Sequence, residues 1–225
     1  MRTPSPISID SQDVLLVIDL QADFMPGGAL AVEGGHEIVP LINRLASRFK
    51  YVVVTQDWHP PEHASFASTH DGAKPFETKH LEYGDQTLWH DHCVQGTPGA
   101  ELHPELAVDL AFLILRKGMH QDIDSYSAFV EADGKTTTGL GALLKAREMK
   151  RVFVCGLATD FCVAHTALDA RREGFAVFVI EDACRAIDAN GSLRKAWARM
   201  TGAEVSPIQS AEILGAVASA SPRSR

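Results

Sequence analysis

Short apolar runs alternate with amphipathic stretches along most of the chain. Five runs are nearly continuous in hydrophobic residues, as is typical of strands buried on both faces, and they span 14–19, 51–57, 110–118, 151–156 and 175–182. Helical periodicity predicts helices over 36–49, 138–150, 160–174, 192–202 and 210–218, with a short sixth strand around 203–207. Strands that alternate with helices predict an α/β fold, a three-layer α/β/α sandwich with a central, mostly parallel six-stranded sheet.

The segment 58–109 interrupts this alternation. It is rich in His, Pro and Gly and shows little periodicity. A connection of this length inside a compact domain usually carries function. A chain of 225 residues favours one domain, so we expect a single domain over 1–225, with a core of about 13–218 and an inserted loop at about 57–109.

Charge and composition exclude several classes of partner. The net charge is −8 and no more than two basic residues are adjacent, whereas a nucleic-acid surface needs a basic stripe. No apolar run approaches the roughly 18 residues that cross a bilayer, and the first residues lack the apolar core of an export signal. The four cysteines have no disulfide-like spacing. We therefore expect a cytoplasmic protein with reduced thiols that binds neither nucleic acid nor membrane.

Reactive side chains stand at the ends of four predicted strands. Asp19, Asp57 and Lys117 end the first three, and Cys162 follows the fourth. In an open parallel sheet, ligands bind beyond the carboxyl ends of the strands. Loop ends are often polar in any protein, but four such residues at one edge favour an active site.

Cys162 lies two residues after Asp160, which we expect to cap the helix that follows. Cysteine is often simply buried. A helix N-terminus also stabilises a thiolate, but only by ~0.3–1 kcal/mol, whereas lowering a thiol pKa from about 8.5 to about 7 needs roughly 2 kcal/mol. A cation or a general base is therefore required as well. Lys117 and Asp19 supply them if they are not merely solvated loop residues, and the set predicts a cysteine hydrolase.

A second cluster has the composition of a metal site. Asp57, His59 and His63 occur as D-x-H-x₃-H, a set that suits zinc, iron or manganese better than calcium. His92 could add a ligand from the far end of the long loop, and His90 competes with it on spacing alone. The alternative is a histidine-rich surface loop, since the chain has ten histidines.

From about residue 13 to 210, the chain resembles the isochorismatase-like cysteine hydrolases, and within them the nicotinamidase branch. The resemblance rests on motifs in the right order: LLVIDLQADFMPGGAL, TQDWHPPEHASFASTH, LWHDHCVQGTPGAELHP, RKG followed by DSYSAF, and VCGLATDFCVAHTALDA. It implies conversion of nicotinamide and water to nicotinate and ammonia through a thioester, within NAD salvage. Deamidation of pyrazinamide and a homo-oligomeric assembly are further expectations.

The resemblance also implies a role for each site residue. Asp19 becomes the general base, Lys117 the cation and Cys162 the nucleophile. The backbone N–H groups of Ala158 and Cys162 form the oxyanion hole, next to a cis peptide at Leu157–Ala158. The resemblance implies one divalent ion, with zinc preferred to iron or manganese. It also implies four ligands, and it selects His92 rather than His90 as the fourth. The metal ligands are Asp57, His59, His63 and His92, and the substrate-binding residues are Phe24, Trp89, Tyr126 and Leu157.

Two positions depart from the family pattern. Ala22 stands where Asn is frequent, and Phe161 replaces a residue that is often Tyr or His. Three rival functions remain at this point: another amidase or ureidase of the superfamily, a zinc-holding pyridine-binding protein with an inert thiol, and a vinyl ether hydrolase. The last dispenses with the catalytic cysteine, so Cys162 opposes it.

Overall fold

The computed structural model describes residues 6–215 and contains a central sheet of six strands. Their order is β5-β2-β1-β6-β7-β8, and every neighbouring pair is parallel, so the predicted fold class is confirmed. The strands are β1 (Asp13–Ile18), β2 (Tyr51–Asp57), β5 (Leu113–Lys117), β6 (Arg151–Leu157), β7 (Ala176–Arg185) and β8 (Ser206–Ile208).

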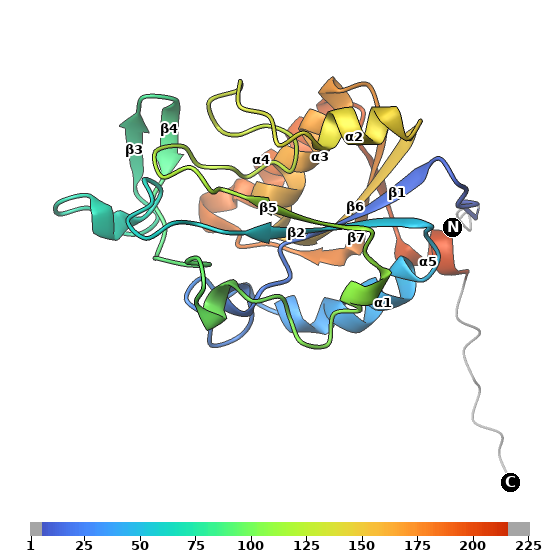
Figure 1. Cartoon of the computed structure of the whole chain (residues 1–225), viewed down its shortest axis with the longest axis horizontal. Coiled ribbons are helices and arrows are strands. Elements are labelled where there is room, and N and C mark those ends of the chain that lie inside the picture. Colours follow the sequence, from blue (N-terminus) through green and yellow to red (C-terminus); the bar gives the residue numbers. More distant parts are fainter. Residues whose placement is uncertain (1–5, 216–225) are drawn as a thin grey trace, which may run out of the picture.

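Helices cover both faces of the sheet (Figure 1). On one face lie α1 (Val39–Ala46) and α5 (Ser210–Leu214), and on the other α2 (Leu140–Ala146), α3 (Ala164–Arg172) and α4 (Ser192–Gly202). Most are shorter than predicted because the chain enters or leaves them through tighter turns. Residues 216–218, the end of the last predicted helix and of the expected core, lie outside the described residues. Short 3₁₀ helices occur at Ala22–Phe24, Gly35–Ile38, Ala67–Thr69, Pro98–Ala100, Val108–Leu110 and Ala189–Gly191.

Strand β1 is the centre of the core. All six of its residues are buried, and Leu16 lies in register between Val53 of β2 and Val154 of β6. Such a strand has no solvent face, which explains its unbroken apolar sequence. The order of strands along the chain reverses between β1 and β6, and a crevice at such a reversal is where ligands bind in this class of sheet.

The long segment 58–109 is more regular than its sequence predicted. It contains a two-stranded antiparallel hairpin, β3 (Thr78–Leu81) and β4 (Gly84–Thr87), which projects beyond the carboxyl edge of the main sheet (Figure 1). The hairpin strands are polar and largely exposed, so they lack the hydrophobic pattern that reveals buried strands. Isolated bridges from His59 to Val94 and from Phe66 to Trp89 fold the rest of the segment back on itself.

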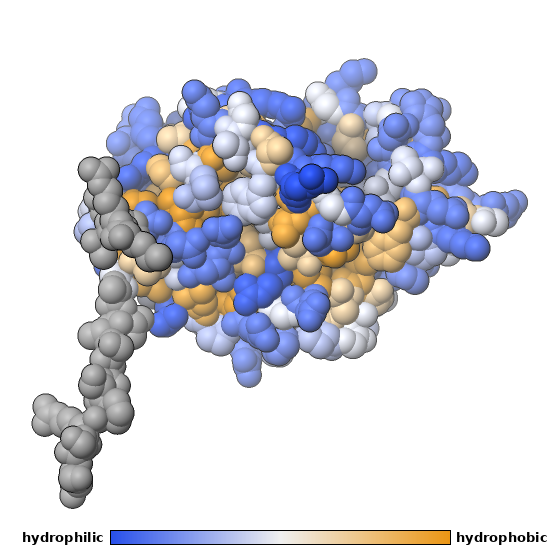
Figure 2. Space-filling view, turned by 180° about the vertical axis from the view of Figure 1, so that it is seen from behind, coloured by the Kyte–Doolittle hydropathy of each residue, from blue (hydrophilic) through white to orange (hydrophobic). Residues whose placement is uncertain are grey.

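Figure 2 shows the face seen from behind, where hydrophobic side chains form patches separated by hydrophilic ones. Within residues 6–215, no helix combines the length and the apolar character that crossing a membrane requires.

Candidate active site

Three strand ends bring Asp19, Lys117 and Cys162 together. Asp19 follows β1, Lys117 ends β5, and Cys162 lies in a single π-helical turn, Thr159–Val163, between β6 and α3. The Lys117 side chain extends past the end of β2, so that its Nζ lies 2.9 Å from Asp19 Oδ2 and 3.4 Å from Cys162 Sγ. A π-helical turn inside a helix often marks a functional site. The structure thus brings all three predicted catalytic residues into one cluster.

Lys117 is a buried cation shared by two buried carboxylates. Its Nζ pairs with Asp19 and Asp57 and donates to Ser125 O at 3.0 Å. Burial alone would lower the pKa of Lys117, but the two carboxylates outweigh it and raise the pKa well above its usual value. Lys117 therefore stays charged.

Asp19 has the properties of a base that is ready to accept a proton. Burial raises its pKa to about 6 against the opposing effect of Lys117. Thr55 Oγ1 donates to Asp19 Oδ1 at 2.6 Å and accepts the Asp19 N–H at 3.1 Å. Asp19 Oδ2 is buried and, apart from the ion pair with Lys117, finds no hydrogen-bond donor within residues 6–215. This oxygen is free to accept a proton from Cys162. The Cys162 sulfur, a carboxylate oxygen of Asp19 and a carboxylate oxygen of Asp57 all lie within 4.8 Å of one another.

Cys162 is a protonated thiol at rest. Burial raises its pKa well above the usual value, Lys117 opposes this, and the charges of Asp19 and Asp57 raise it further. The helix N-terminus and Lys117 stabilise the thiolate less than burial destabilises it. The sequence led us to expect that these two features would lower the pKa of the thiol. A base is therefore needed to form the nucleophile, and Asp19 is adjacent to it.

A second group of buried side chains fits a divalent metal ion. One ligand atom from each of Asp57, His59 and His92 lies within 4.8 Å of the others. The Nε2 atoms of His59 and His92 lie 3.7 and 3.9 Å from Asp57 Oδ2. Their outer nitrogens bond to backbone, His59 Nδ1 to Gly118 O at 3.0 Å and His92 Nδ1 to His90 O at 2.8 Å. Such contacts orient the inner nitrogens as metal ligands, so the residues present fit the ion.

His63 stands apart from these three ligands. Its ring lies beside that of His59, with centroids 4.3 Å apart, but it groups with His59 and Asp124 rather than with Asp57 and His92. Its Nδ1 contacts Ser65 Oγ at 2.7 Å and its Nε2 contacts Ile123 O at 3.3 Å. Both ring nitrogens are therefore occupied.

The sequence reasoning missed Asp124 and Gln21. Asp124 is buried beside the histidines and accepts from Gln86 Nε2 at 2.7 Å. Gln21 holds the backbone of Asp57: it accepts the Asp57 N–H at 2.7 Å and donates to the Asp57 carbonyl at 2.8 Å. Both lie in motifs that carried the family resemblance, IDLQ and DSYSAF, but no periodicity assigned them a role.

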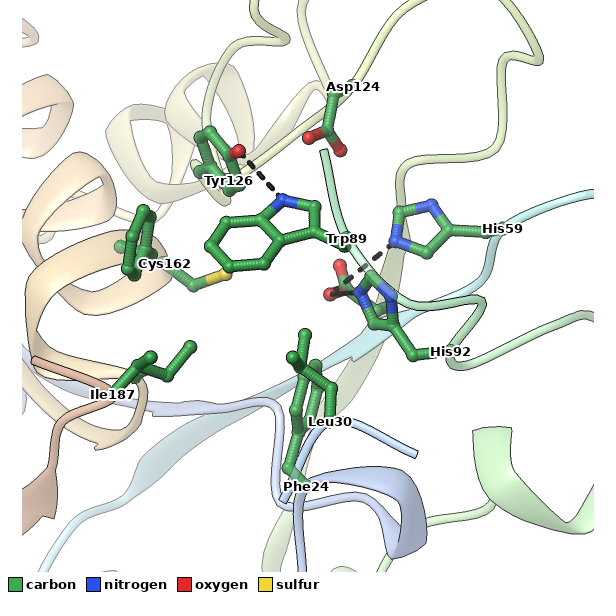
Figure 3. A pocket seen from close by; sticks show the side chains of 12 residues that line it. Phe24, Leu30, His59, Trp89, His92, Asp124, Tyr126, Cys162 and Ile187 are labelled. Carbon is green, nitrogen blue, oxygen red and sulfur yellow. Dashed lines mark hydrogen bonds and ion pairs between the residues drawn. The ribbon is translucent and has the colours of Figure 1, made fainter. Parts of the chain in front are cut away.

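A pocket joins the thiol to the metal-binding group. Figure 3 shows Cys162 on one side, His59 and His92 on the other, and the side chains of Trp89 and Phe24 between them. The lining also includes Tyr126, whose hydroxyl accepts from Trp89 Nε1 at 2.9 Å. The full lining is Phe24, Leu30, Asp57, His59, Trp89, His92, Asp124, Tyr126, Ala158, Phe161, Cys162 and Ile187.

The Leu157–Ala158 peptide is cis, as the resemblance implies, and Ala158 lies in the pocket wall next to Cys162. Leu157, predicted to bind substrate, is fully buried and is absent from the lining among the described residues. Its side chain instead packs against Gly35, where even a methyl group would meet Leu157 Cδ1 at 3.2 Å. Four lining residues were not among the predicted site residues: Leu30, Asp124, Phe161 and Ile187. Of these, Phe161 was noted only as a departure from the family pattern.

Fold and site together define a hydrolase-type parallel α/β domain with a thiol, a carboxylate and a lysine at its switch point. The chain belongs to the isochorismatase family, whose domain model matches residues 13–212. The predicted family is thus confirmed. A nicotinamidase of Acinetobacter baylyi is 56% identical over 200 residues, which cover 89% of this chain and 94% of that protein.

Three solved structures are similar over most of both chains. That of an Acinetobacter baumanii nicotinamidase and pyrazinamidase has a TM-score of 0.89 at 55% identity, covering 90% of this chain and 98% of that one. PnC1 of L. infantum in complex with nicotinate has a TM-score of 0.81 at 42% identity, with coverages of 92% and 98%. The pyrazinamidase of Pyrococcus horikoshii in complex with zinc has a TM-score of 0.71 at 36% identity, with coverages of 88% and 99%.

Proposed function

We propose that the chain is a nicotinamidase, an amidohydrolase that converts nicotinamide and water to nicotinate and ammonia. One observation carries the proposal: the thiol of Cys162 and the histidines His59 and His92 lie on opposite sides of a single pocket with aromatic walls, and Asp57 lies beside both groups. A flat pyridine ring with a carboxamide has a ring nitrogen at one end and a reactive carbonyl carbon at the other. The pocket accommodates this molecule with the ring beside Trp89 and Phe24.

The first half of the reaction releases ammonia. Asp19 takes the proton of Cys162, and the thiolate attacks the amide carbon to form a carbon–sulfur bond. The backbone N–H groups of Ala158 and Cys162 receive the oxyanion, where one such donor can be worth ~3 kcal/mol. Asp19 then returns its proton to the amide nitrogen, the carbon–nitrogen bond breaks, and a thioester remains.

The second half restores the thiol. Asp19 takes a proton from water as the water oxygen attacks the thioester carbon. The carbon–sulfur bond breaks, nicotinate leaves, and the proton passes from Asp19 to Cys162. Throughout the cycle Lys117 keeps its charge, which stabilises whichever of Asp19 and Cys162 is anionic.

Asp57, His59 and His92 would hold the metal ion, which when bound supplies an electron-pair acceptor for the pyridine nitrogen. These three residues thereby orient the substrate instead of forming the nucleophile, since Cys162 fills that role. Zinc is our first choice because one carboxylate and two imidazoles suit it, with iron and manganese as alternatives. His63, predicted as a fourth ligand, could offer Nε2 to the ion in place of its contact with Ile123 O and keep the contact of Nδ1 with Ser65 Oγ.

The decisive experiment measures nicotinate formation from nicotinamide by the wild type, Cys162→Ala and Asp19→Asn. The wild type should turn over, and each variant should lose at least about 10³-fold in kcat, because the nucleophile or its base is missing. Equal rates in all three proteins would remove the catalytic roles of Cys162 and Asp19. A wild type that hydrolyses ureides or carbamoyl compounds but not nicotinamide would favour another amidase of the family.

Pyrazinamide is included in the proposal because it presents the same carboxamide on a similar ring. Participation in NAD salvage follows from the reaction. A cytoplasmic location belongs to the same proposal, since a reducing compartment keeps a catalytic thiol available. A homo-oligomeric assembly stays a prediction.

A further inference from the structure

Asp160 does not cap the helix that follows it, contrary to the expectation from its position. Ala158 occupies the N-cap and makes no side-chain cap bond. The Asp160 carboxylate, which is 4% exposed, instead accepts the backbone N–H of Ile187 at 3.1 Å and that of Asp188 at 2.8 Å, and it accepts the hydroxyl of Ser192. A residue two positions before the nucleophile thus holds a loop that is 27–32 positions away in sequence.

The loop held in this way has a backbone that needs outside support. Between β7 and α4, the φ angles of Asp188, Asn190 and Gly191 are 51°, 54° and 73°. The left-handed region is unfavourable for residues with a side chain, and such a conformation persists only where the surroundings enforce it. The hydrogen bonds from this loop to Asp160, together with the one from the Leu193 N–H to Asp188 Oδ1, hold this conformation.

The same loop supplies one wall of the pocket, through Ile187. In Figure 3 this side chain lies on the side of Cys162, away from His59 and His92. Phe161 and Ala158, from the π-helical turn and its approach, line the pocket next to the sulfur. If the ring nitrogen faces the metal-binding group, Ile187 therefore faces the carboxamide that reacts at Cys162.

We infer that Ile187 is a specificity-determining residue that limits the reacting amide to an unsubstituted nitrogen, and that Asp160 is the positioning residue that holds Ile187 in place. The inference rests on the proposed function and extends it to the class of amide accepted. A methyl group on the amide nitrogen would occupy the space that the branched Ile187 side chain fills. A primary amide leaves this space free, whereas the alkyl group of an N-alkyl amide would clash with the Ile187 side chain.

The test compares nicotinamide, its N-methylated amide and a 5-methyl ring analogue in the wild type, Ile187→Val and Ile187→Ala. Hydrolysis of nicotinamide and of its N-methylated amide is measured as the formation of nicotinate, which is the product of both. The ratio of kcat/KM for the N-methyl amide to that for nicotinamide should rise about tenfold or more in Ile187→Ala, and less in Ile187→Val. An unchanged ratio, or a gain confined to the ring analogue, would overturn the role of Ile187.

Asp160 is tested with Asp160→Asn and Asp160→Ser, against Ser192→Ala as the matched control. Asn replaces one of the two acceptor oxygens with an amide donor, which then faces one of the two backbone N–H groups, and Ser keeps only one acceptor oxygen. Both variants should therefore raise the same ratio and raise KM for nicotinamide more than they lower kcat. Ser192→Ala removes one hydroxyl but leaves the bonds to Ile187 and Asp188, and its ratio should stay at the wild-type value. Equal ratios in all four proteins would refute the positioning role. A wild type inactive on nicotinamide would instead refute the proposed function.

Discussion

At the scale of single residues, the site depends on one cation that serves two carboxylates and a thiol. Lys117 is 1% exposed and its side chain pairs with Asp19 and Asp57. Burial of charge is costly unless it is compensated, and here each charge has a partner of opposite sign. The same arrangement leaves one Asp19 oxygen for the thiol proton.

Replacing Lys117 with Met should both destabilise the fold and abolish turnover. The substitution keeps the apolar stem but leaves two buried carboxylates without a cation, a change that typically costs ~3–5 kcal/mol. Urea denaturation measures the free energy of unfolding. Lys145→Met is the control: Lys145 pairs with Glu173 at the surface, and exposed pairs contribute at most about 1 kcal/mol. Similar losses in the two variants would contradict this account of Lys117.

The pH dependence of turnover should follow the titration of Asp19. Its pKa is raised to about 6, so the basic form is lost and the rate falls as the pH falls through about 6. The hydroxyl of Thr55 donates to this carboxylate and stabilises its charged form. Thr55→Val should therefore raise the pKa of Asp19 further and move the acid limb of the kcat/KM profile, which reports groups of the free enzyme, to higher pH. An acid limb that stays at the same pH or moves to lower pH would show that a group other than Asp19 controls it.

At the scale of elements, the position of the nucleophile depends on how closely β6 approaches β1. Gly156 lies in β6 with φ 115°, at a shift in the β6–β7 register. A Cβ there would lie 2.2 Å from Ile18 O, so no side chain is tolerated. This close packing delivers Cys162 to the end of β1, next to Asp19.

Gly156→Ala should therefore cost about 3 kcal/mol or more, because strand separation is added to an unfavourable φ. Gly174 is the matched control, since its φ is 95° but nothing lies within 4 Å of the position that an added methyl group would take. Gly174→Ala should cost only about 1 kcal/mol, from backbone strain alone. Thermal and urea denaturation of both variants measure the difference, and equal costs would mean that the contact with Ile18 O is easily relieved.

At the scale of the whole molecule, the segment 58–109 closes the site over the edge of the sheet. It contributes His59, His92 and Trp89, whereas Asp57 belongs to β2 and Cys162 follows β6. The metal-binding group therefore joins the segment to the core. A ligand that binds only the folded protein stabilises it by mass action, by about 2.7 kcal/mol at a hundredfold excess over Kd.

Removal of divalent metal with a chelator should lower the melting temperature and raise KM for nicotinamide at least as much as it lowers kcat. Added zinc should restore both, because the metal orients the substrate and ties the segment to the sheet. Differential scanning fluorimetry and steady-state kinetics measure the two effects. His92→Ala should lose the response to zinc, whereas His90→Ala should keep it. Carefully purified protein that contains no metal and is fully active would refute the metal site.

The sequence by itself determined the layers and most of the chemistry. Strands such as β1 and β2 are buried on both faces, and their apolar runs end at Asp19 and Asp57 because the chain leaves the core there. Composition and position thus predicted the nucleophile cluster together with Asp57, His59 and His63, whereas the choice of His92 over His90 came from the family resemblance. They also placed the four residues at strand ends, Asp19, Asp57, Lys117 and Cys162, at one edge of one sheet, since parallel strands end together.

Only the tertiary structure decided which side chains meet. Strand order determines that Lys117 extends past β2 to Asp19, and backbone hydrogen bonds turn Asp160 toward Ile187 rather than its own helix. It likewise grouped His63 with His59 and Asp124 rather than with Asp57 and His92, and it buried Leu157 outside the pocket lining. Periodicity reports whether a residue is buried within its own element. It carries no information on contacts between segments distant in sequence, which depend on packing of the whole chain.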